Sequence, residues 1–135
     1  MITAVDTNVL LDIFGADAKF GEVSANAVRQ CLGEGALIAC EAVWAETGTA
    51  FQSSEKFRHA MTDLGVTFEP MSEATAVNAA EAWRRYRGRG GRRTRIVSDF
   101  LIGAHALSAA DRLLTRDRGF YRRYFAGLKV LDPSA

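Results

Sequence analysis

The fold is decided by a stretch near the start of the chain, Ile2-Thr3-Ala4-Val5-Asp6-Thr7-Asn8. Its first four residues form a short, β-prone run, and the next three are residue types that often cap the start of a helix. The simplest interpretation is a strand that leads directly into a helix, which ends at Gly15. An acid placed at the end of a first strand lies where α/β proteins bind ligands.

The same alternation of strand and helix continues along the chain. Four more runs have the composition of short strands, at residues 36–39, 66–69, 112–115 and 128–131. Helical spacing and capping residues predict helices at residues 8–14, 22–32, 41–51, 55–64 and 99–110, the last of which Ser98 can cap. A further helix is predicted to begin at Ser72 and to end within the arginine-rich residues 84–95. In the helix capped by Ser72, the apolar residues Val77, Ala80 and Trp83 share one face. This order predicts an α/β fold, in which a five-stranded parallel sheet is covered by helices on both faces.

Size and composition indicate one globular domain. The chain has 135 residues, of which 48% are hydrophobic and 24% charged, and we expect a single domain over residues 1–135. The opening residues lack the features of a secretory signal, and no apolar run approaches the roughly 18 residues of a membrane span. An isolated pair of cysteines, Cys31 and Cys40, is better interpreted as reduced. These features predict a cytoplasmic protein without a membrane segment.

Charge is segregated along the sequence although the formal net charge is only +1. Residues 84–95 contain many arginines and no acid. Because this run includes Gly88, Gly90 and Gly91, it could be no more than a solvated loop. Because it ends shortly before Asp99, it could instead grip phosphates beside a catalytic cleft. The arginines predicted to bind RNA are Arg85, Arg87, Arg89, Arg92, Arg93 and Arg95.

Four acids are placed so that they can meet at one edge of the sheet. Asp6 and Asp117 follow predicted strands directly or within two residues, and Asp99 opens the helix that leads to the second of these strands. Glu46 lies at the edge of the apolar stripe of its helix, whereas Glu41 points almost oppositely, so Glu46 is the better candidate. Taken alone, Asp6 or Asp99 could serve only to stabilise a helix start, and Glu46 could be a solvated helix residue.

Carboxylates gathered in one cleft repel each other unless a cation balances them. The candidate ligands are oxygen-rich, with only His59 and His105 as nitrogen donors, and this favours Mg²⁺ or Mn²⁺ over zinc. Such ions lower the pKa of bound water and neutralise charge on a reacting phosphate. The predicted chemistry is hydrolysis of a phosphodiester.

Four segments resemble the ordered motifs of PIN-domain nucleases, and together they extend over essentially the whole chain. They are Asp6-Thr7-Asn8-Val9-Leu10-Leu11-Asp12, Val43-Trp44-Ala45-Glu46, Ser98-Asp99-Phe100-Leu101-Ile102-Gly103-Ala104-His105-Ala106 and Leu113-Leu114-Thr115-Arg116-Asp117. The compact length and these motifs are most similar to VapC-type toxins of bacterial toxin–antitoxin pairs, which are Mg²⁺-dependent endoribonucleases.

The resemblance implies more than the pattern alone. It implies a PIN-like three-layer αβα sandwich with sheet order 3-2-1-4-5, a homodimer, and a cognate antitoxin whose tail blocks the acidic site. The acids that it implies as metal-binding and catalytic residues are Asp6, Glu46, Asp99 and Asp117. It also implies that three further residues, Thr7, Asn8 and Thr115, hold these ligands or their bound waters in place.

Other functions share parts of this pattern. Phosphatases of the haloacid dehalogenase type need a second acid where Asn8 stands, and nucleotide-binding loops need glycines or a lysine that the segment lacks. A housekeeping RNA-processing nuclease would have the same site as a toxin. A non-catalytic RNA-binding PIN domain is a further alternative, although such domains have lost acids that this chain retains.

The C-terminal segment is rich in aromatic residues, namely Phe120, Tyr121, Tyr124 and Phe125. We expect these side chains to pack in the core or on a partner subunit rather than to stack on bases.

Overall fold

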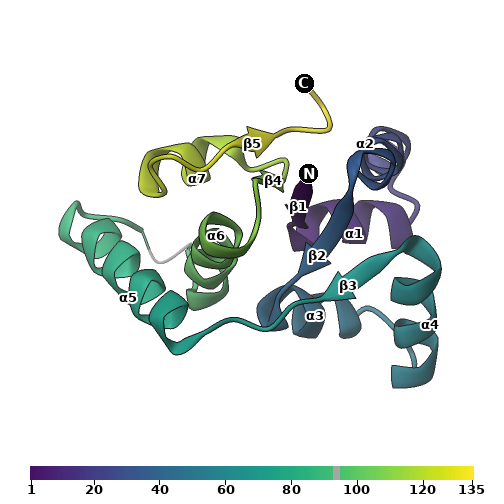
Figure 1. The fold of residues 1–135 in the computed structure, drawn as a ribbon, viewed down its shortest axis with the longest axis horizontal. Helices are drawn as coiled ribbons and strands as arrows, with labels where there is room; N and C mark the ends of the chain where they lie inside the picture. The colour runs from purple at the N-terminus through teal and green to yellow at the C-terminus, as the bar shows by residue number, and fades with distance from the viewer. Residues whose placement is uncertain (93–94) are drawn as a thin grey trace.

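The fold is an α/β arrangement built on one parallel sheet. The structure is a computed structural model that describes residues 1–92 and 95–135. The predicted RNA-binding residue Arg93 lies outside the described residues. Neighbouring strands are all parallel, in the order β3-β2-β1-β4-β5, as predicted (Figure 1). The strands are β1 (Ile2–Val5), β2 (Ala36–Ala39), β3 (Val66–Phe68), β4 (Arg112–Leu114) and β5 (Val130–Leu131).

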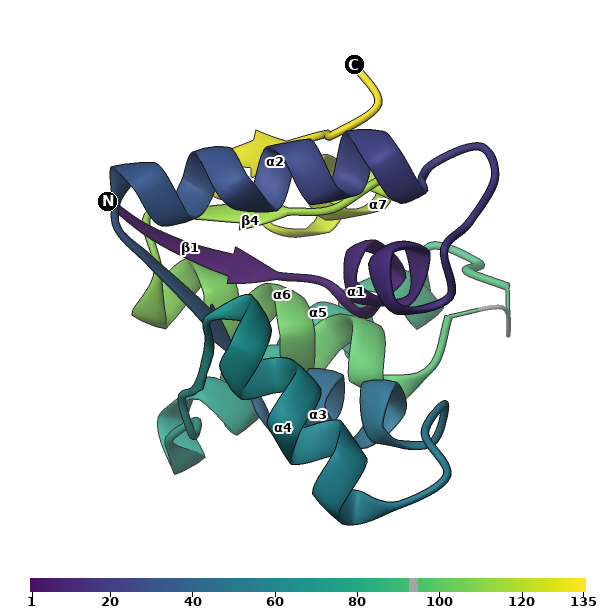
Figure 2. The same ribbon diagram turned by 90° about the vertical axis from the view of Figure 1, so that its right-hand side faces the viewer.

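Helices cover both sides of this sheet. In two perpendicular views α2 lies on one side of the strands and α5 and α6 lie on the other, which gives the predicted three layers (Figures 1 and 2). The helices are α1 (Thr7–Phe14), α2 (Gly21–Glu34), α3 (Glu41–Gly48), α4 (Ser54–Leu64), α5 (Glu73–Gly88), α6 (Val97–Ala109) and α7 (Arg118–Tyr124).

Side chains cap the starts of three helices, two of them at the predicted residues Asp6 and Ser72. The Asp6 carboxylate accepts a hydrogen bond from the Thr7 backbone N–H at the start of α1. Ser53 and Ser72 each accept the backbone N–H three residues further on, at the starts of α4 and α5. Gly65 ends α4 in the left-handed conformation, at φ 95°, which favours glycine. Local side-chain chemistry therefore sets these boundaries.

The start of α6 differs from the prediction that Ser98 caps it. The helix begins at Val97 and its N-cap position is Ile96, whose side chain makes no capping hydrogen bond. Instead the Asp99 carboxylate accepts the Ile96 backbone N–H at 3.1 Å. The predicted cap is wrong because Asp99 already satisfies this donor, and the Ser98 hydroxyl is directed elsewhere.

The buried face of α5 is not the apolar face that the sequence suggests. The residues that α5 buries are Thr75, Ala79, Ala82 and Tyr86. Val77 is 46% exposed and Trp83 is only partly buried. The small side chains of Ala79 and Ala82 allow α5 to pack closely on α6, and this contact outweighs the burial of larger residues. Trp83 therefore lies at the edge of the helix pair.

The C-terminal aromatic residues pack into the core, which confirms the packing interpretation. All four are buried, namely Phe120, Tyr121, Tyr124 and Phe125. The ring of Phe120 meets that of Phe100 edge to face at 5.3 Å. Helix α7 is thus attached to the α5–α6 layer through aromatic contacts.

Cys31 and Cys40 are both buried and form no disulfide, as predicted. Within residues 1–92 and 95–135, no helix is long and apolar enough to cross a membrane.

Two glycines in helices test how tightly this core is packed. A methyl group added at Gly103 of α6 would overlap the buried ring of Phe125, whereas one at Gly33 of α2 would meet nothing within 4 Å. We expect Gly103→Ala to lower the free energy of unfolding by roughly 1–3 kcal/mol. Gly33→Ala should raise it by about 0.5–1 kcal/mol, because alanine favours the helix. Urea denaturation measures both, and equal effects of the two substitutions would contradict this packing.

Candidate active site

The four predicted acids converge at the carboxyl ends of β1 and β4. Asp6 directly follows β1, and its backbone N–H donates to the Leu114 carbonyl of β4 at 2.9 Å, so the two strand ends are joined. Asp117 follows β4, Glu46 lies on α3, and Asp99 lies in the first turn of α6. Their charges act on one another: the charge of Asp99 raises the pKa of Asp6, and the charges of Glu46 and Asp117 raise that of Asp99.

Asp6 is the most buried of the four acids, with 6% of its surface exposed. Its Oδ1 accepts the Thr7 backbone N–H at 2.7 Å, and its Oδ2 accepts the Thr115 hydroxyl at 2.8 Å and the Asn8 amide at 3.3 Å. Burial raises the pKa of Asp6 from 3.8 to about 6, although these hydrogen bonds act in the opposite direction. The partners of this carboxylate are neutral groups, so its negative charge is poorly balanced.

Thr7, Asn8 and Thr115, which the sequence places beside the acids, form hydrogen bonds between them. The Thr7 hydroxyl donates to Oε1 of Glu46 at 2.7 Å. The Asn8 amide lies 3.3 Å from the Thr115 hydroxyl, and that hydroxyl accepts the Asp117 backbone N–H at 3.0 Å. These three side chains therefore hold Asp6, Glu46 and the Asp117 backbone in fixed relative positions.

Glu46 is held on both carboxylate oxygens. Besides the bond from Thr7, its Oε2 accepts the Ser98 hydroxyl at 3.0 Å. Glu41 is directed away and accepts the Met71 backbone N–H at 3.1 Å, in agreement with the helical-wheel argument for Glu46. Ser98 was missed as a site residue because a serine beside Asp99 has the appearance of a helix cap.

Arg95 pairs with Asp117 through two hydrogen bonds, and the bond from Nη2 to Oδ1 is 3.1 Å long. Its guanidinium also lies 4.3 Å from the centre of the Phe120 ring. The pairing balances the charge of Asp117. Arg95 is thus directed toward an acid of the site, whereas the sequence prediction assigned it to RNA.

Asp99 is a partly buried acid of the site. Its burial has the largest effect on its pKa and raises it.

Tyr121 is a further contact of the buried acid that the sequence does not reveal. Its hydroxyl lies near Asp6 and lowers the pKa of that carboxyl, and burial raises the pKa of Tyr121 itself well above the ordinary value. The sequence indicated only that Tyr121 packs in the core. Its position beside Asp6 depends on how α7 returns to the sheet, and no spacing rule gives that geometry.

A buried ion pair holds the segment after β4 against α1. Asp12, which is 5% exposed, receives two hydrogen bonds from the Arg116 guanidinium, at 2.7 and 3.0 Å. The Arg116 backbone N–H donates to Oδ1 of Asn8 at 3.3 Å. Since Arg116 stands between Thr115 and Asp117, this pair positions both residues of the site. The sequence gives no separate signal for it.

The arginine-rich stretch is divided among different surroundings. Arg85 donates to the Tyr124 carbonyl at 3.4 Å, and Arg89 is exposed at the end of α5. Arg87, Arg92 and Arg95 instead line a cleft of about 720 Å³, which we call the arginine cleft. Its lining residues are Trp83, Tyr86, Arg87, Gly91, Arg92, Arg95, Ile96 and Val97.

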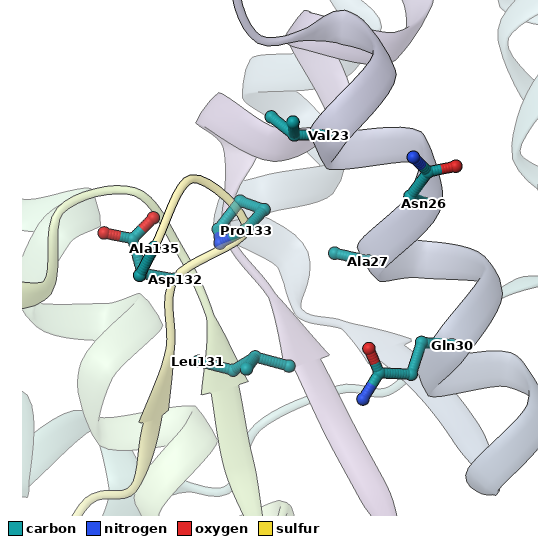
Figure 3. Close-up of a pocket in the computed structure, with 8 residues that line it drawn as sticks. All are labelled: Val23, Asn26, Ala27, Gln30, Leu131, Asp132, Pro133 and Ala135. Carbon is teal, nitrogen blue, oxygen red and sulfur yellow. The ribbon is translucent and has the colours of Figure 1, made fainter.

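A smaller cleft, of about 300 Å³, lies between α2 and the segment around β5 (Figure 3). Val23, Asn26 and Gln30 line it from the helix, and Asp132 and Pro133 line it from the C-terminal segment (Figure 3). None of the four candidate acids lines it. The acidic site is therefore adjoined by the arginine cleft rather than by this one.

The acids fit a hard divalent cation in donor type and in charge. Their oxygens are the donors that Mg²⁺ and Mn²⁺ prefer, and burial, which raises the pKa of Asp6, disfavours its negative charge unless a cation balances it. In the part of the chain that the structure describes, no three His, Cys, Asp or Glu side chains lie close enough to enclose a metal ion directly. Mg²⁺ usually retains several waters and binds one or two carboxylates directly. The fit to such an ion therefore rests on donor type and charge, not on a closed cage of ligands.

Solved structures with the same fold come from bacterial toxin–antitoxin complexes. A chain of VapBC-1 from nontypeable Haemophilus influenzae aligns with a TM-score of 0.76 and 21% identity over 100% of both chains. A chain of VapBC2 from Rickettsia felis, solved with a promoter DNA fragment, aligns with a TM-score of 0.75 and 17% identity over 98% of both. Mycobacterium tuberculosis VapC20, a sarcin-ricin loop cleaving toxin, aligns with a TM-score of 0.54 and 14% identity over 82% of this chain and 86% of its own.

Sequence comparison identifies the family more directly than these structures. No curated protein sequence matches significantly. The family model of the PIN domain, however, matches residues 3–126, which include all four acids. The chain therefore belongs to the PIN-domain family.

Proposed function

We propose that this protein is an endoribonuclease that hydrolyses RNA phosphodiester bonds with Mg²⁺ or Mn²⁺. The observation that carries the proposal is the buried Asp6, whose raised pKa and acidic neighbours create a demand for a cation at the end of β1. Membership of the PIN-domain family supports the same chemistry. Asp6, Glu46, Asp99 and Asp117 would hold the ion, some of them through its bound waters.

When bound, the ion would lower the pKa of a water and neutralise charge on the reacting phosphate. The chain's own residues set the positions of its ligands. Thr7 and Ser98 hold the two oxygens of Glu46, while Thr115 and Asn8 hold Oδ2 of Asp6. Because both carboxylates are held before any ligand binds, little reorganisation is needed on binding.

Asp117 is expected to contribute less than the other acids. Arg95 already pairs with it, and a guanidinium in that position competes with a cation for the carboxylate. The same guanidinium lies at the edge of the acidic site, where it could instead contact a phosphate. We therefore assign Asp117 a weaker role as a metal ligand.

The proposed biological role is that of a toxin in a toxin–antitoxin pair. Proteins with this fold were solved as VapBC complexes, and one is named a sarcin-ricin loop cleaving toxin. We propose that this chain likewise inhibits growth by cutting RNA, assembles as a homodimer, and is blocked by a cognate antitoxin. A housekeeping RNA-processing nuclease and a non-catalytic RNA-binding domain are the competing functions.

The first prediction concerns cleavage of bacterial RNA by the purified protein. Cleavage should require Mg²⁺ or Mn²⁺ and stop in EDTA, because the acids need a cation to act. Asp6→Asn and Asp99→Asn should each lower the rate by roughly 100-fold or more, and Asp117→Asn by a smaller factor. Asp63→Asn, which removes an exposed acid paired with His59, is the matched control and should be neutral. Metal-independent cleavage, or full activity of Asp6→Asn, would refute the proposal.

A second prediction concerns the pH dependence of stability without metal. The pKa of Asp6 is about 6 in the folded protein against 3.8 ordinarily, so folding favours its protonated form. The stabilisation is complete below about pH 4 and is lost as pH rises through about 6. The loss should be about 3 kcal/mol at most, at 1.36 kcal/mol per pKa unit.

Urea unfolding in EDTA at pH 4.5 and 7.5 tests this expectation, with Asp6→Asn as the reference that cannot titrate at this position. Stability relative to Asp6→Asn should fall between the two pH values, and Mg²⁺ should restore it at pH 7.5. Parallel pH profiles for the two proteins would show that burial does not affect this carboxyl as described.

A third prediction separates the toxin from a housekeeping nuclease. Induced expression in bacteria should arrest growth, and the Asp6→Asn variant expressed at the same level should not. Co-expression of a small protein encoded beside this chain should restore growth if that protein is the antitoxin. Normal growth with active enzyme present would favour a housekeeping role.

A further inference from the structure

The arginine cleft is chemically unlike the acidic site that it adjoins. Among the described residues, its lining combines arginines with apolar or aromatic side chains and includes no acid. Ile96 and Val97 are exposed, at 55% and 46%, although they are large apolar residues. A volume of about 720 Å³ falls in the range of small-ligand sites. The ligand that such a cleft suits is flat, partly apolar and negatively charged.

Trp83 and Arg87 form a stacked pair on one wall of this cleft. One face of the Trp83 indole stacks on Phe100, with ring centres 5.7 Å apart and an interplanar angle of 17°. The guanidinium of Arg87 lies over the Trp83 ring at 4.9 Å from its centre, and the Arg87 side chain is exposed. A guanidinium supported in this way offers a planar, charged surface on which a nucleobase can stack.

The lining residues Gly91 and Arg92 are held in place by Tyr86. The Tyr86 hydroxyl donates to the Arg92 carbonyl, and the Gly91 backbone N–H donates to the Tyr86 carbonyl at 2.9 Å. A side chain at residue 91 would overlap the Tyr86 ring, so glycine is needed for this close approach. These lining residues are therefore positioned from the core of α5.

The cleft adjoins the acidic site through two residues. Arg95 lines the cleft and also pairs with Asp117. Ile96 lines it and donates its backbone N–H to Asp99. A ligand in the cleft therefore lies next to residues that contact two of the acids.

We propose that the arginine cleft binds an unpaired nucleobase of single-stranded RNA next to the bond that is cut, with Arg87 on Trp83 as the stacking surface. Arg92 is placed to meet the adjoining phosphate. The proposal rests on the proposed nuclease function, because it takes the strand to be the substrate. A base in a duplex is already stacked and paired, so only an unpaired base can stack on Arg87. An acidic peptide would satisfy the arginines but leave the apolar wall without a partner.

Tryptophan fluorescence provides a direct test, since the chain has only two tryptophans. In a Trp44→Phe background Trp83 is the only indole, and short single-stranded oligoadenylate should quench its emission on binding in EDTA, where cleavage is prevented. Trp83→Phe, which retains Trp44, should show no quenching by the same RNA. Fluorescence anisotropy of labelled RNA measures binding independently.

Matched substitutions on α5 isolate the stacking surface. Arg87→Lys keeps the charge but loses the planar group, and it should weaken RNA binding about tenfold, within the range of base-stacking energies. Arg84→Lys is the control, because Arg84 is exposed on the same helix but does not line the cleft, and it should bind as the unmodified protein does. Thermal melting should show that both variants are folded.

The outcomes separate this proposal from the proposed function. RNA binding without quenching of Trp83, or equal affinity of the Arg87→Lys and Arg84→Lys variants, would overturn the base site even if the unmodified enzyme cleaves RNA. Quenching together with weaker binding by Arg87→Lys would support the site even if no cleavage occurs. Equal quenching by a polyglutamate peptide would overturn it in favour of an acidic peptide ligand.

Discussion

The site depends on the burial of one carboxylate, that of Asp6 at the end of β1. An acid with 6% exposure is costly to ionise, and its pKa of about 6 measures that cost. The surrounding hydrogen bonds from Thr7, Asn8 and Thr115 reduce the cost but bring no positive charge. Either protonation of Asp6 or a bound cation can neutralise this negative charge. Much of the polar structure around this edge of the sheet follows from the need to hold Asp6 there.

The arginines near the site pair with other acids and do not neutralise the charge of Asp6. Arg116 is committed to Asp12, and Arg95 to Asp117, each through two hydrogen bonds. The first pair positions the segment that carries Thr115 and Asp117, and the second adjusts the charge of a single acid. Had Arg95 faced Asp6, it would have stabilised the fold at the expense of a cation site. A residual negative charge at Asp6 is what the proposed function requires.

The fold could be predicted well from the sequence, because short apolar runs and capping residues are local signals. The boundaries of β1 and α1 follow from Ile2–Val5 and Asp6 alone. The sequence predictions were wrong where side-chain packing, and not local sequence, determines the structure. The apolar face of α5 was assigned by residue type, whereas Ala79 and Ala82 are buried because small residues allow close helix contact. The directions of side chains could not be predicted for the same reason. Spacing along the chain does not indicate that Ser98 faces Glu46 or that Arg95 faces Asp117.

Charge segregation explains how a chain with a net charge of only +1 could bind RNA at one place. The acidic site would repel a phosphate, while the arginine cleft beside it would attract one, and Arg95 belongs to both. A cation bound to the acids would turn this repulsion into attraction and would leave the attraction by the arginine cleft unchanged. Metal binding would then bring the two regions to the same sign of potential, so a strand could cross from base site to acids without an electrostatic barrier. In this arrangement the cation contributes to substrate binding as well as to chemistry, and the fold needs no excess of basic residues.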